Sequence, residues 1–465
     1  MYNGIKFTNN SDIEKITEAS FKILNDYGVL AEHESFAQIL CDYSPDSISY
    51  NENRIRIKKE YARNYFLSFC NNASQNHAAS QERQPNVSAY AELYQGYYLD
   101  PYDGKHKEWN EDRLLSYIKL AQRLPDIGSI TMLGCPVKDF PVHKRPLVEK
   151  LYAFKYGTTN PSSIWDTALC SDLYKIWEIY ADERKMPISD VFRGCVYFIS
   201  PLKMGYVEAE QILWFRERGL KVNTGCMSSI GLGMPVTIAG ALALHIAEQL
   251  FISIMHAALF GEKRFWLVCS LFTADMRSGS SRFGRPEQLL ANNAISDIAS
   301  FYSIPFYPLS GLSDAKLPSF EAGVQKLGTA LAGIMKGYDG HIAAGLLSVD
   351  EVYSPVQMAL DNEAAGYLKR ICRGFSIDTE ELALEAIKLF VNEDLLFIGQ
   401  EHTARNINEL WQPSIFSQDG FSGWKNDIDI DKARDIAISI MEGPPLTSLI
   451  SENCEEKIRK VINET

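Results

Sequence analysis

The sequence has no run of lysines and arginines and no C-x-x-C pair, although it contains nine cysteines. Among its 465 residues, 46 Lys and Arg stand against 59 Asp and Glu, which gives a formal net charge of −13. Nucleic-acid phosphates require a basic surface, so this charge argues against a nucleic-acid partner. The odd number and wide spacing of the cysteines also argue against a disulfide framework.

Long uninterrupted apolar runs are absent as well. The first residues, MYNGIKFTNNSDIEKI, contain no apolar stretch of signal-peptide length. The longest apolar segment, Val236–Phe260, is interrupted by polar side chains, which indicates a buried helix rather than a membrane span. The interrupting residues are His245, Glu248, Gln249 and His256. We therefore expect a cytoplasmic protein without a membrane partner.

Three common enzyme motifs are also missing, namely G-x-x-x-x-G-K-[ST], H-E-x-x-H and G-x-S-x-G. The GLGMPV stretch at Gly231–Val236 resembles a phosphate-binding loop, but it lacks the third glycine of G-x-G-x-x-G. A tight turn with Pro235 at the first position of a helix explains this stretch without a ligand.

Metal-ligand residues occur, but without the spacing typical of metal sites. Cys135, Cys226 and His341 fall near the ends of expected strands, as do the adjacent Glu401 and His402. Neighbouring residues of a strand point to opposite faces, so only one of the last two could join a site. We expect no bound metal.

The chain has ample material for a large core, because 46% of its residues are hydrophobic and 23% are charged. Up to residue 125 the pattern predicts helices, a hairpin at Ser49–Lys59 and a loop rich in tyrosine. From Asp126 onward, short apolar runs alternate with amphipathic helical stretches, which is typical of βα units. The expected strands are Ser129–Gly134, Ser162–Asp166, Phe192–Ser200, Lys221–Met227, Phe265–Phe272, Phe306–Ser310, His341–Leu346 and Leu396–Gln400. The expected helices are Pro146–Tyr156, Ser171–Asp182, Tyr206–Arg218, Pro235–Phe260, Pro286–Tyr302, Phe320–Lys336, Ser354–Arg373 and Thr379–Val391.

Eight strands with intervening helices predict an α/β fold, a (β/α)8 TIM barrel over residues 126–410. Residues 1–125 would form a helical and hairpin segment packed on the barrel, and residues 411–465 a C-terminal extension. An open doubly wound sheet is the alternative, because periodicity cannot show whether the sheet closes.

Active sites of TIM barrels lie where the strands run into their following loops. At these positions the sequence places Trp165, Asp314, Lys316, His341 and Glu401. Few of these groups suit a nucleophile or general base, whereas aromatic side chains suit a permanent cation. The competing interpretation is that Trp165 and the tyrosines are ordinary core or interface residues.

Several stretches resemble the trimethylamine methyltransferase (MttB) superfamily, which comprises corrinoid-dependent methyltransferases built on a TIM barrel. The specific stretches are PVTIAGALALHIAE, beginning at Pro235, and the SDAK segment of LSGLSDAKLPSFEAGVQK. Other matching stretches run nearly from end to end, among them HIAAGLLSVDEVYSPVQMALDNE and IGQEHTARNINELWQP. The resemblance implies the same barrel and a methyl-transfer reaction.

One difference between this sequence and the trimethylamine enzymes bears on the class of substrate. In the trimethylamine enzymes a pyrrolysine lies in or next to the stretch matching Gly340–Gly345, but this sequence reads GHIAAG there. The chain therefore resembles the non-pyrrolysine branch, whose studied members demethylate quaternary amines such as betaines. A quaternary nitrogen already carries its positive charge, so a Co(I) corrinoid can take its methyl group without help from a general acid.

The resemblance thus implies methyl transfer from a small quaternary amine to the cobalt of a separate corrinoid protein. The methylated cobalamin belongs to that partner, so we expect no permanently bound cofactor. Whether the chain forms a homo-oligomer stays open. For the trimethylammonium group we expect an aromatic cage of Trp165, Tyr97 and Tyr98. His341 and Lys316 would hold the carboxylate of a betaine.

Asp314 and Glu401 are the remaining candidates. Either they supply a negative charge near the cation, or they orient Lys316 and His402, and the orienting role is the favoured one. Two other functions stay open. One is a barrel that binds a betaine without turnover. The other is a zinc-dependent methyltransferase or metal-dependent lyase on the same fold.

Overall fold

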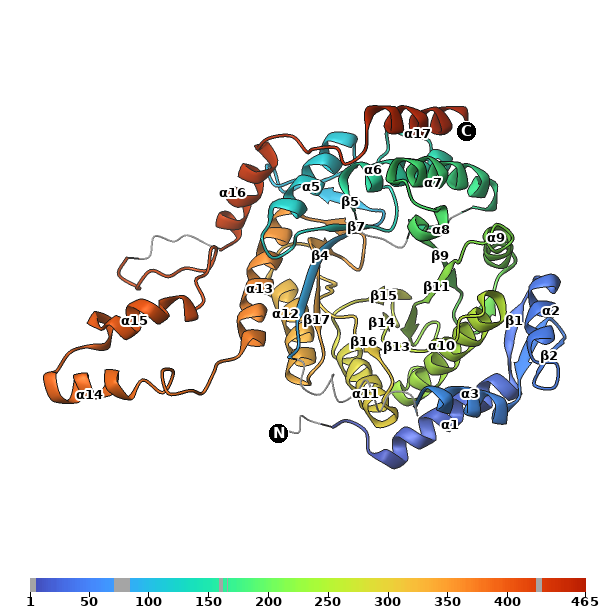
Figure 1. The fold of residues 1–465 in the computed structure, drawn as a ribbon, viewed down its shortest axis with the longest axis horizontal. Coiled ribbons are helices and arrows are strands. Elements are labelled where there is room, and N and C mark those ends of the chain that lie inside the picture. Colours follow the sequence, from blue (N-terminus) through green and yellow to red (C-terminus); the bar gives the residue numbers. More distant parts are fainter. Residues whose placement is uncertain (1–5, 71–83, 159–161, 165, 424–428) are drawn as a thin grey trace.

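The computed structural model describes residues 6–70, 84–158, 162–164, 166–423 and 429–465. In Figure 1, short strands surround a common centre and helices form the layer outside them. This arrangement confirms the expected mixed α/β class. Helices and strands alternate along most of the chain, as the sequence pattern predicted.

The strands around this centre, which we call the strand ring, run parallel in three hydrogen-bonded groups. The groups are β17–β4–β7, β8–β9–β11 and β13–β16. The chain continues from β11 into β12 and from β13 into β14, and β12 pairs with β14. The bounds are β4 (Val87–Leu93), β7 (Ile130–Met132), β8 (Ser162–Ser163), β9 (Gly194–Phe198), β11 (Asn223–Cys226), β12 (Ser228–Ile230), β13 (Leu267–Val268), β14 (Leu271–Asp275), β16 (Phe306–Tyr307) and β17 (Gly340–Ala344).

The end of β16 lies against β17 through individual hydrogen bonds. Ser310 Oγ donates to the His341 carbonyl at 3.0 Å, and the Ala343 N–H donates to the Gly311 carbonyl at 3.2 Å. Gly311 has a positive φ of 70°, and a Cβ there would lie 2.1 Å from the His341 oxygen. Only glycine allows the two segments to approach this closely.

The outer helices begin and end at local sequence signals. The Ser354 hydroxyl caps α13 by accepting from the Gln357 N–H at 3.1 Å, and Gly157 ends α6 in the left-handed conformation. Seven expected helices are confirmed, with ends shifted by a few residues. They are α6 (Arg145–Tyr156), α7 (Cys170–Arg184), α9 (Tyr206–Arg216), α10 (Ile238–Phe260), α11 (Pro286–Tyr302), α12 (Phe320–Met335) and α13 (Pro355–Arg373).

Helix α10 is long and apolar enough to cross a membrane by length and composition alone, but 78% of its most apolar window is buried inside the protein. The N-terminal segment packs against it through α1. The expected hairpin is confirmed as β2 and β3, an antiparallel pair. The segment contains α1 (Asn10–Asp26), β1 (Val29–Ala31), α2 (Glu34–Tyr43), β2 (Ile48–Asn51), β3 (Arg54–Ile57) and α3 (Lys59–Cys70).

Smaller elements complete the body. Strands β18, β19, β5 and β6 form a separate sheet, and β1 pairs in parallel with β10 at the edge of the sheet that contains β2 and β3. Helix α16 packs on α13 and α5, and α17 packs on α6 and α7. The bounds are β5 (Tyr97–Leu99), β6 (His106–Lys107), α5 (Glu111–Arg123), η1 (Val142–Lys144), η2 (Thr167–Leu169), α8 (Ile188–Val191), β10 (Lys203–Met204), β15 (Ser280–Arg282), β18 (Leu346–Leu347), β19 (Val352–Tyr353), α16 (Asp429–Glu442) and α17 (Glu452–Glu464).

The first and last strands of the ring differ from the prediction. The stretch Leu396–Gln400, expected as the eighth strand, contains a 3-10 helix, η3 (Phe397–Gly399). The first strand is instead β4, within the stretch interpreted as a tyrosine-rich loop. The ring therefore begins before residue 126 and its last strand ends at Ala344, so the expected boundary at 125/126 falls inside it.

The remaining helices, α14 (Leu384–Glu393), α15 (Glu401–Asn406) and η4 (Ile407–Glu409), extend away from the strand ring (Figure 1). The expected helix Thr379–Val391 corresponds to α14, which begins later. The apolar run at 395–398 suggested a strand because length and composition alone do not distinguish a buried strand from a short helical segment.

Candidate functional site

The inner face of β4 carries polar side chains. Val87, Ala89 and Ala91 alternate with Ser88, Tyr90 and Glu92, and the first set is buried on the side where α13 packs. Because successive side chains of a strand point to opposite faces, the second set faces the centre of the strand ring. The register of β4 with β17 pairs Ser88 with His341.

A histidine–carboxylate pair joins β17 to β4 inside the ring. His341 Nε2 lies 3.0 Å from Glu92 Oε1, and His341 Nδ1 lies 3.4 Å from Ser88 Oγ. The Tyr90 aromatic ring lies 4.6 Å from the imidazole, centroid to centroid. Burial, followed by the charge of Glu92, raises the pKa of Tyr90 to about 12, so its phenol is neutral at physiological pH.

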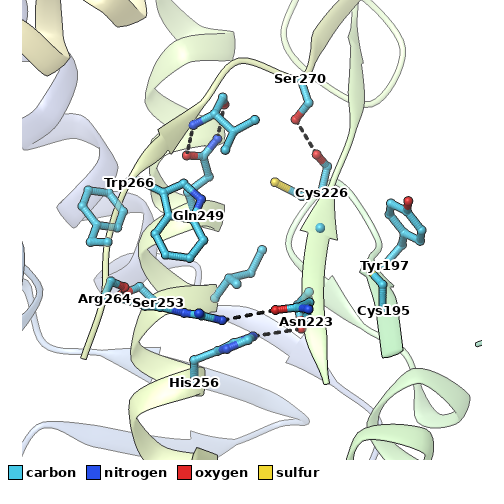
Figure 2. Close-up of a pocket in the computed structure, with 15 residues that line it drawn as sticks. Cys195, Tyr197, Asn223, Cys226, Gln249, Ser253, His256, Arg264, Trp266 and Ser270 are labelled. Carbon is cyan, nitrogen blue, oxygen red and sulfur yellow. Dashed lines mark hydrogen bonds between the residues drawn. The ribbon is translucent and has the colours of Figure 1, made fainter. Parts of the chain in front are cut away.

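A cavity of about 340 Å³ lies between β9, β11, β13 and α10. Figure 2 shows Tyr197 and Trp266 on opposite sides of it. Val268 also lines the cavity, and Tyr307 is its register partner on β16, so the exposed phenol of Tyr307 lies on the same face. Aromatic side chains from β9, from β16 and from the residue before β13 thus face the interior.

Few charged groups line this cavity. Arg264 donates to Asn223 Oδ1 at 3.2 Å, and its guanidinium carbon lies 4.9 Å from the centroid of Trp266. Burial, and then the charge of Arg264, lowers the pKa of His256 to about 4, so this histidine is neutral. A mainly apolar wall with a few fixed polar groups is typical of small-molecule sites.

Of the three residues expected to form an aromatic cage, the structure describes Tyr97 and Tyr98, and it places them in different environments. Trp165 lies outside the described residues. Tyr97 is 52% exposed on β5, whereas Tyr98 is only 2% exposed and packs edge-on against Trp109, 5.1 Å between centroids. Tyr98 is therefore a core residue. It lies in a separate sheet from Tyr90, so it does not contribute a wall to the interior of the strand ring.

Asp314 and Lys316 lie together in the loop after β16. Asp314 is 6% exposed as a side chain and is surrounded by three cations: Arg282 at 3.2 Å, Lys316 at 3.0 Å and Arg285 at 3.4 Å. Its charge is neutralised locally by these contacts, which fits the expected role of orienting Lys316. This is one of the two roles that the sequence left open. The cluster as a whole carries positive charge.

Glu401 lies far from the strand ring, and this corrects the expectation that it ends a strand. It begins α15, is exposed, and pairs with Arg405 Nη2 at 2.7 Å (Figure 1). The error follows from the missing strand at 396–400, because that strand would have carried Glu401 and His402 to the ring. Glu92 occupies an interior position instead.

The sequence also missed the interior residues Tyr90, Glu92, Tyr197 and Trp266. One signal for the first two was available. Residues 87–93 read VSAYAEL, an alternation of period two that is typical of a strand with one polar face.

Cys226, His245 and Glu248 are the described residues best able to hold a metal, since their ligand atoms lie within 4.8 Å of one another. His245 Nε2 lies 2.7 Å from the Val268 carbonyl, while its buried Nδ1 has no partner. Glu248, however, accepts hydrogen bonds from the Leu202 N–H at 2.8 Å and a serine hydroxyl at 2.7 Å. Both of its oxygens therefore already hold the turn after β9.

Fold and site together define an α/β protein whose parallel strands surround an interior that contains aromatic side chains and the Glu92 carboxylate. The family model described as trimethylamine methyltransferase (MTTB) matches residues 2–460. The chain belongs to this family, as the sequence motifs predicted.

Individual relatives are more distant. The chain is 28% identical over 244 residues to trimethylamine methyltransferase MttB of Methanosarcina barkeri, which covers 52% of this chain and 49% of the relative. It is 28% identical over 229 residues to glycine betaine methyltransferase of Desulfitobacterium hafniense (strain Y51), covering 49% and 47%. The alignments thus span about half the length of these curated relatives.

Among solved structures, the crystal structure of monomethylamine methyltransferase from Methanosarcina barkeri aligns with a TM-score of 0.46 and 10% identity. The alignment covers 98% of this chain and 88% of the other.

Proposed function

We propose that this protein transfers a methyl group from a small quaternary amine of the betaine type to the Co(I) of a separate corrinoid protein. The observation that carries the proposal is the interior of the strand ring, where Tyr90 and Glu92 lie beside each other on β4. An aromatic face and a carboxylate both attract a permanent cation. The glycine betaine methyltransferase relative supports the same substrate class.

The chain's own contribution is to bind, align and desolvate the substrate. The aromatic walls exclude water from the quaternary nitrogen, and the Glu92 carboxylate balances its charge. The basic cluster of Lys316, Arg282 and Arg285 suits the carboxylate of a betaine. When the methyl group leaves, its bonding electron pair stays on nitrogen, so the departing amine is neutral and requires no proton. Co(I) supplies the electron pair of the new bond.

The corrinoid partner would dock at the carboxyl-terminal ends of the strands. An exposed apolar patch lies there, made of Met227, Leu232, Val236 and Met276, which are 46%, 61%, 69% and 70% exposed. It follows β11, β12 and β14 along the chain. Apolar patches of this kind mark interaction sites. In this proposal the strand ring is a closed (β/α)8 barrel with this patch at its mouth.

The decisive experiment incubates the purified protein with Co(I) cobalamin or a Co(I) corrinoid protein and a panel of amines. Methylation is followed by the change in the cobalt absorption spectrum. We expect methylation with one of glycine betaine, carnitine, proline betaine or choline, and none with trimethylamine. Turnover of trimethylamine alone would overturn the proposal. Binding of a betaine without methylation would establish an inactive binding protein instead.

A further inference from the structure

Between α13 and α16, one segment of the chain extends away from the strand ring and its surrounding helices. Residues 375–410, which we call the arm, contain α14, η3, α15 and η4 (Figure 1). Of the large apolar side chains exposed in the described part of the chain, thirteen lie in the arm. They are Phe375, Ile377, Leu382, Leu384, Ile387, Phe390, Val391, Leu395, Leu396, Phe397, Ile398, Ile407 and Leu410.

The arm is an ordered element. Gln400 is 4% exposed, and its Nε2 donates to the Ala386 carbonyl at 3.1 Å and the Leu395 carbonyl at 2.7 Å. Phe390 stacks on Phe397 with 5.2 Å between centroids. These contacts join α14, η3 and α15, so the arm presents its outer apolar side chains in a fixed arrangement.

That apolar surface points to a permanent partner. Monomeric proteins rarely expose a contiguous apolar patch larger than a few hundred Å², because such patches aggregate. Interfaces that form and dissociate repeatedly have a small apolar centre within an otherwise polar area, whereas obligate interfaces are apolar over a larger area and resemble a divided core. A corrinoid protein that exchanges methyl groups must dissociate. A second copy of this chain need not.

A second exposed apolar surface, on α12, matches the apolar surface of the arm. Phe320, Val324 and Met335 are 89%, 52% and 60% exposed, and their spacing places them along one side of the helix. Gly323 and Gly328 lie nearby on α12, and a Cβ on either would meet nothing within 4 Å. The two glycines leave room for another helix to approach closely.

Helix α14 has the complementary pattern. Leu384, Ile387 and Val391 recur at three- and four-residue spacing and are 63%, 45% and 71% exposed. In a twofold dimer each contact occurs twice, so one arm and one α12 per copy supply both halves of the interface. A specific interface requires about 20–30 residues on each side, which the arm and α12 together provide.

We propose that this protein is a symmetric homodimer in which the arm of each copy packs on α12 of the other. The inference is independent of the proposed reaction, because it concerns a surface away from the strand ring. It also assigns the arm, where the sequence had expected an active-site strand, to assembly.

The test is analytical ultracentrifugation of the full chain at micromolar concentration, with three single variants. Val391→Glu changes the arm, Val324→Glu changes α12, and Val142→Glu is the matched control at a 72% exposed position outside both surfaces. We expect a dimer for the wild type and for Val142→Glu. Each of the other variants should weaken dimerisation at least about 30-fold, as removal of an interface hot spot does.

A hydrogen-exchange measurement keeps the proposal testable if a variant fails to fold. On dilution of the wild type below its dimer dissociation constant, amides of α14 and α12 should exchange faster. A monomeric wild type would overturn the proposal, and so would a dimer that neither substitution weakens. A dimer sensitive to Val391→Glu but not to Val324→Glu would exclude α12 as the acceptor. Protection of the arm only after addition of a corrinoid protein would assign the arm to that partner.

Discussion

At the scale of single residues, Glu92 is the carboxylate that faces the interior of the strand ring. It pairs with His341 at 3.0 Å and lies two residues from Tyr90 on the same face of β4. Its position allows it to attract a cation held against the Tyr90 ring, while its hydrogen bond to His341 keeps it in place. Binding affinity for a quaternary amine should therefore depend on its charge.

We expect Glu92→Gln to raise KM for the quaternary amine about tenfold, because the neutral amide loses a cation contact worth roughly 1–2 kcal/mol. The amide still accepts from the imidazole, so the melting temperature should change little. Steady-state kinetics and a thermal melt measure the two effects. Glu401→Gln on the arm is the control and should leave KM unchanged. An unchanged KM in Glu92→Gln would place the substrate elsewhere.

The buried carboxyl of Glu248 should make stability depend on pH. Burial raises the pKa of its carboxyl from 4.5 to about 7. Burial lowers the pKa of nearby His245 from 6.5 to about 4, so its contribution to stability rises with pH between these values, opposite to that of Glu248. Because the folded state holds a proton on Glu248 that the unfolded state has released, the contribution of this carboxyl to stability should fall as the pH rises from about 4.5 to about 7. The expected loss is roughly 3 kcal/mol.

Glu248→Gln tests this assignment, because glutamine resembles the protonated carboxyl and can keep the contact with the Leu202 N–H. Urea unfolding between pH 5 and pH 7 should show that the stability of the wild type falls relative to that of the variant as the pH rises. Equal slopes for both proteins would mean that another group titrates.

At the scale of elements, one buried ion pair joins α12, α13 and the end of β17. Lys326 and Asp361 have side chains only 1% and 2% exposed and lie 2.8 Å apart. Lys326 Nζ also donates to the Ala343 carbonyl at 2.5 Å, and Asp361 accepts from the Gly345 N–H at 2.8 Å. The pair thus fixes two helices to the strand that carries His341.

We expect Lys326→Met to lower the free energy of unfolding by about 3–5 kcal/mol, because it leaves Asp361 buried without its cation. Lys316→Met is the control, since Lys316 is 56% exposed and an exposed pair contributes only about 0–1 kcal/mol. Chemical denaturation of both variants measures the difference. A small loss in Lys326→Met would contradict the role of this ion pair in joining the two helices.

Most elements could be predicted from sequence, and the errors have physical causes. The amphipathic helices repeat every 3.6 residues over many residues, so their pattern is long enough to recognise. Strands of two to five residues carry little pattern. In β4 the inner positions are serine, tyrosine and glutamate, so no apolar run marked this strand. The run at 395–398 is apolar although it is exposed on the arm, so a strand was expected at Leu396–Gln400.

At the scale of the whole molecule, we expect the purified protein to carry neither stoichiometric metal nor corrinoid. Both carboxylate oxygens of Glu248 already accept hydrogen bonds, and the proposed cofactor belongs to the partner. Metal analysis by mass spectrometry and the absorption spectrum measure both quantities. One equivalent of zinc that disappears in Cys226→Ser would contradict this expectation and favour a metal-dependent reaction.

The sequence by itself determined the α/β class, the positions of the long helices and the family, because periodicity and local motifs are carried by neighbouring residues. The tertiary structure alone decided which side chains share the interior. His341 and Glu92 are 249 residues apart and meet at 3.0 Å only because β17 pairs with β4. Likewise, burial and not sequence pattern assigned Tyr98 to the core, and exposure of the arm became visible only once the rest of the chain had packed without it.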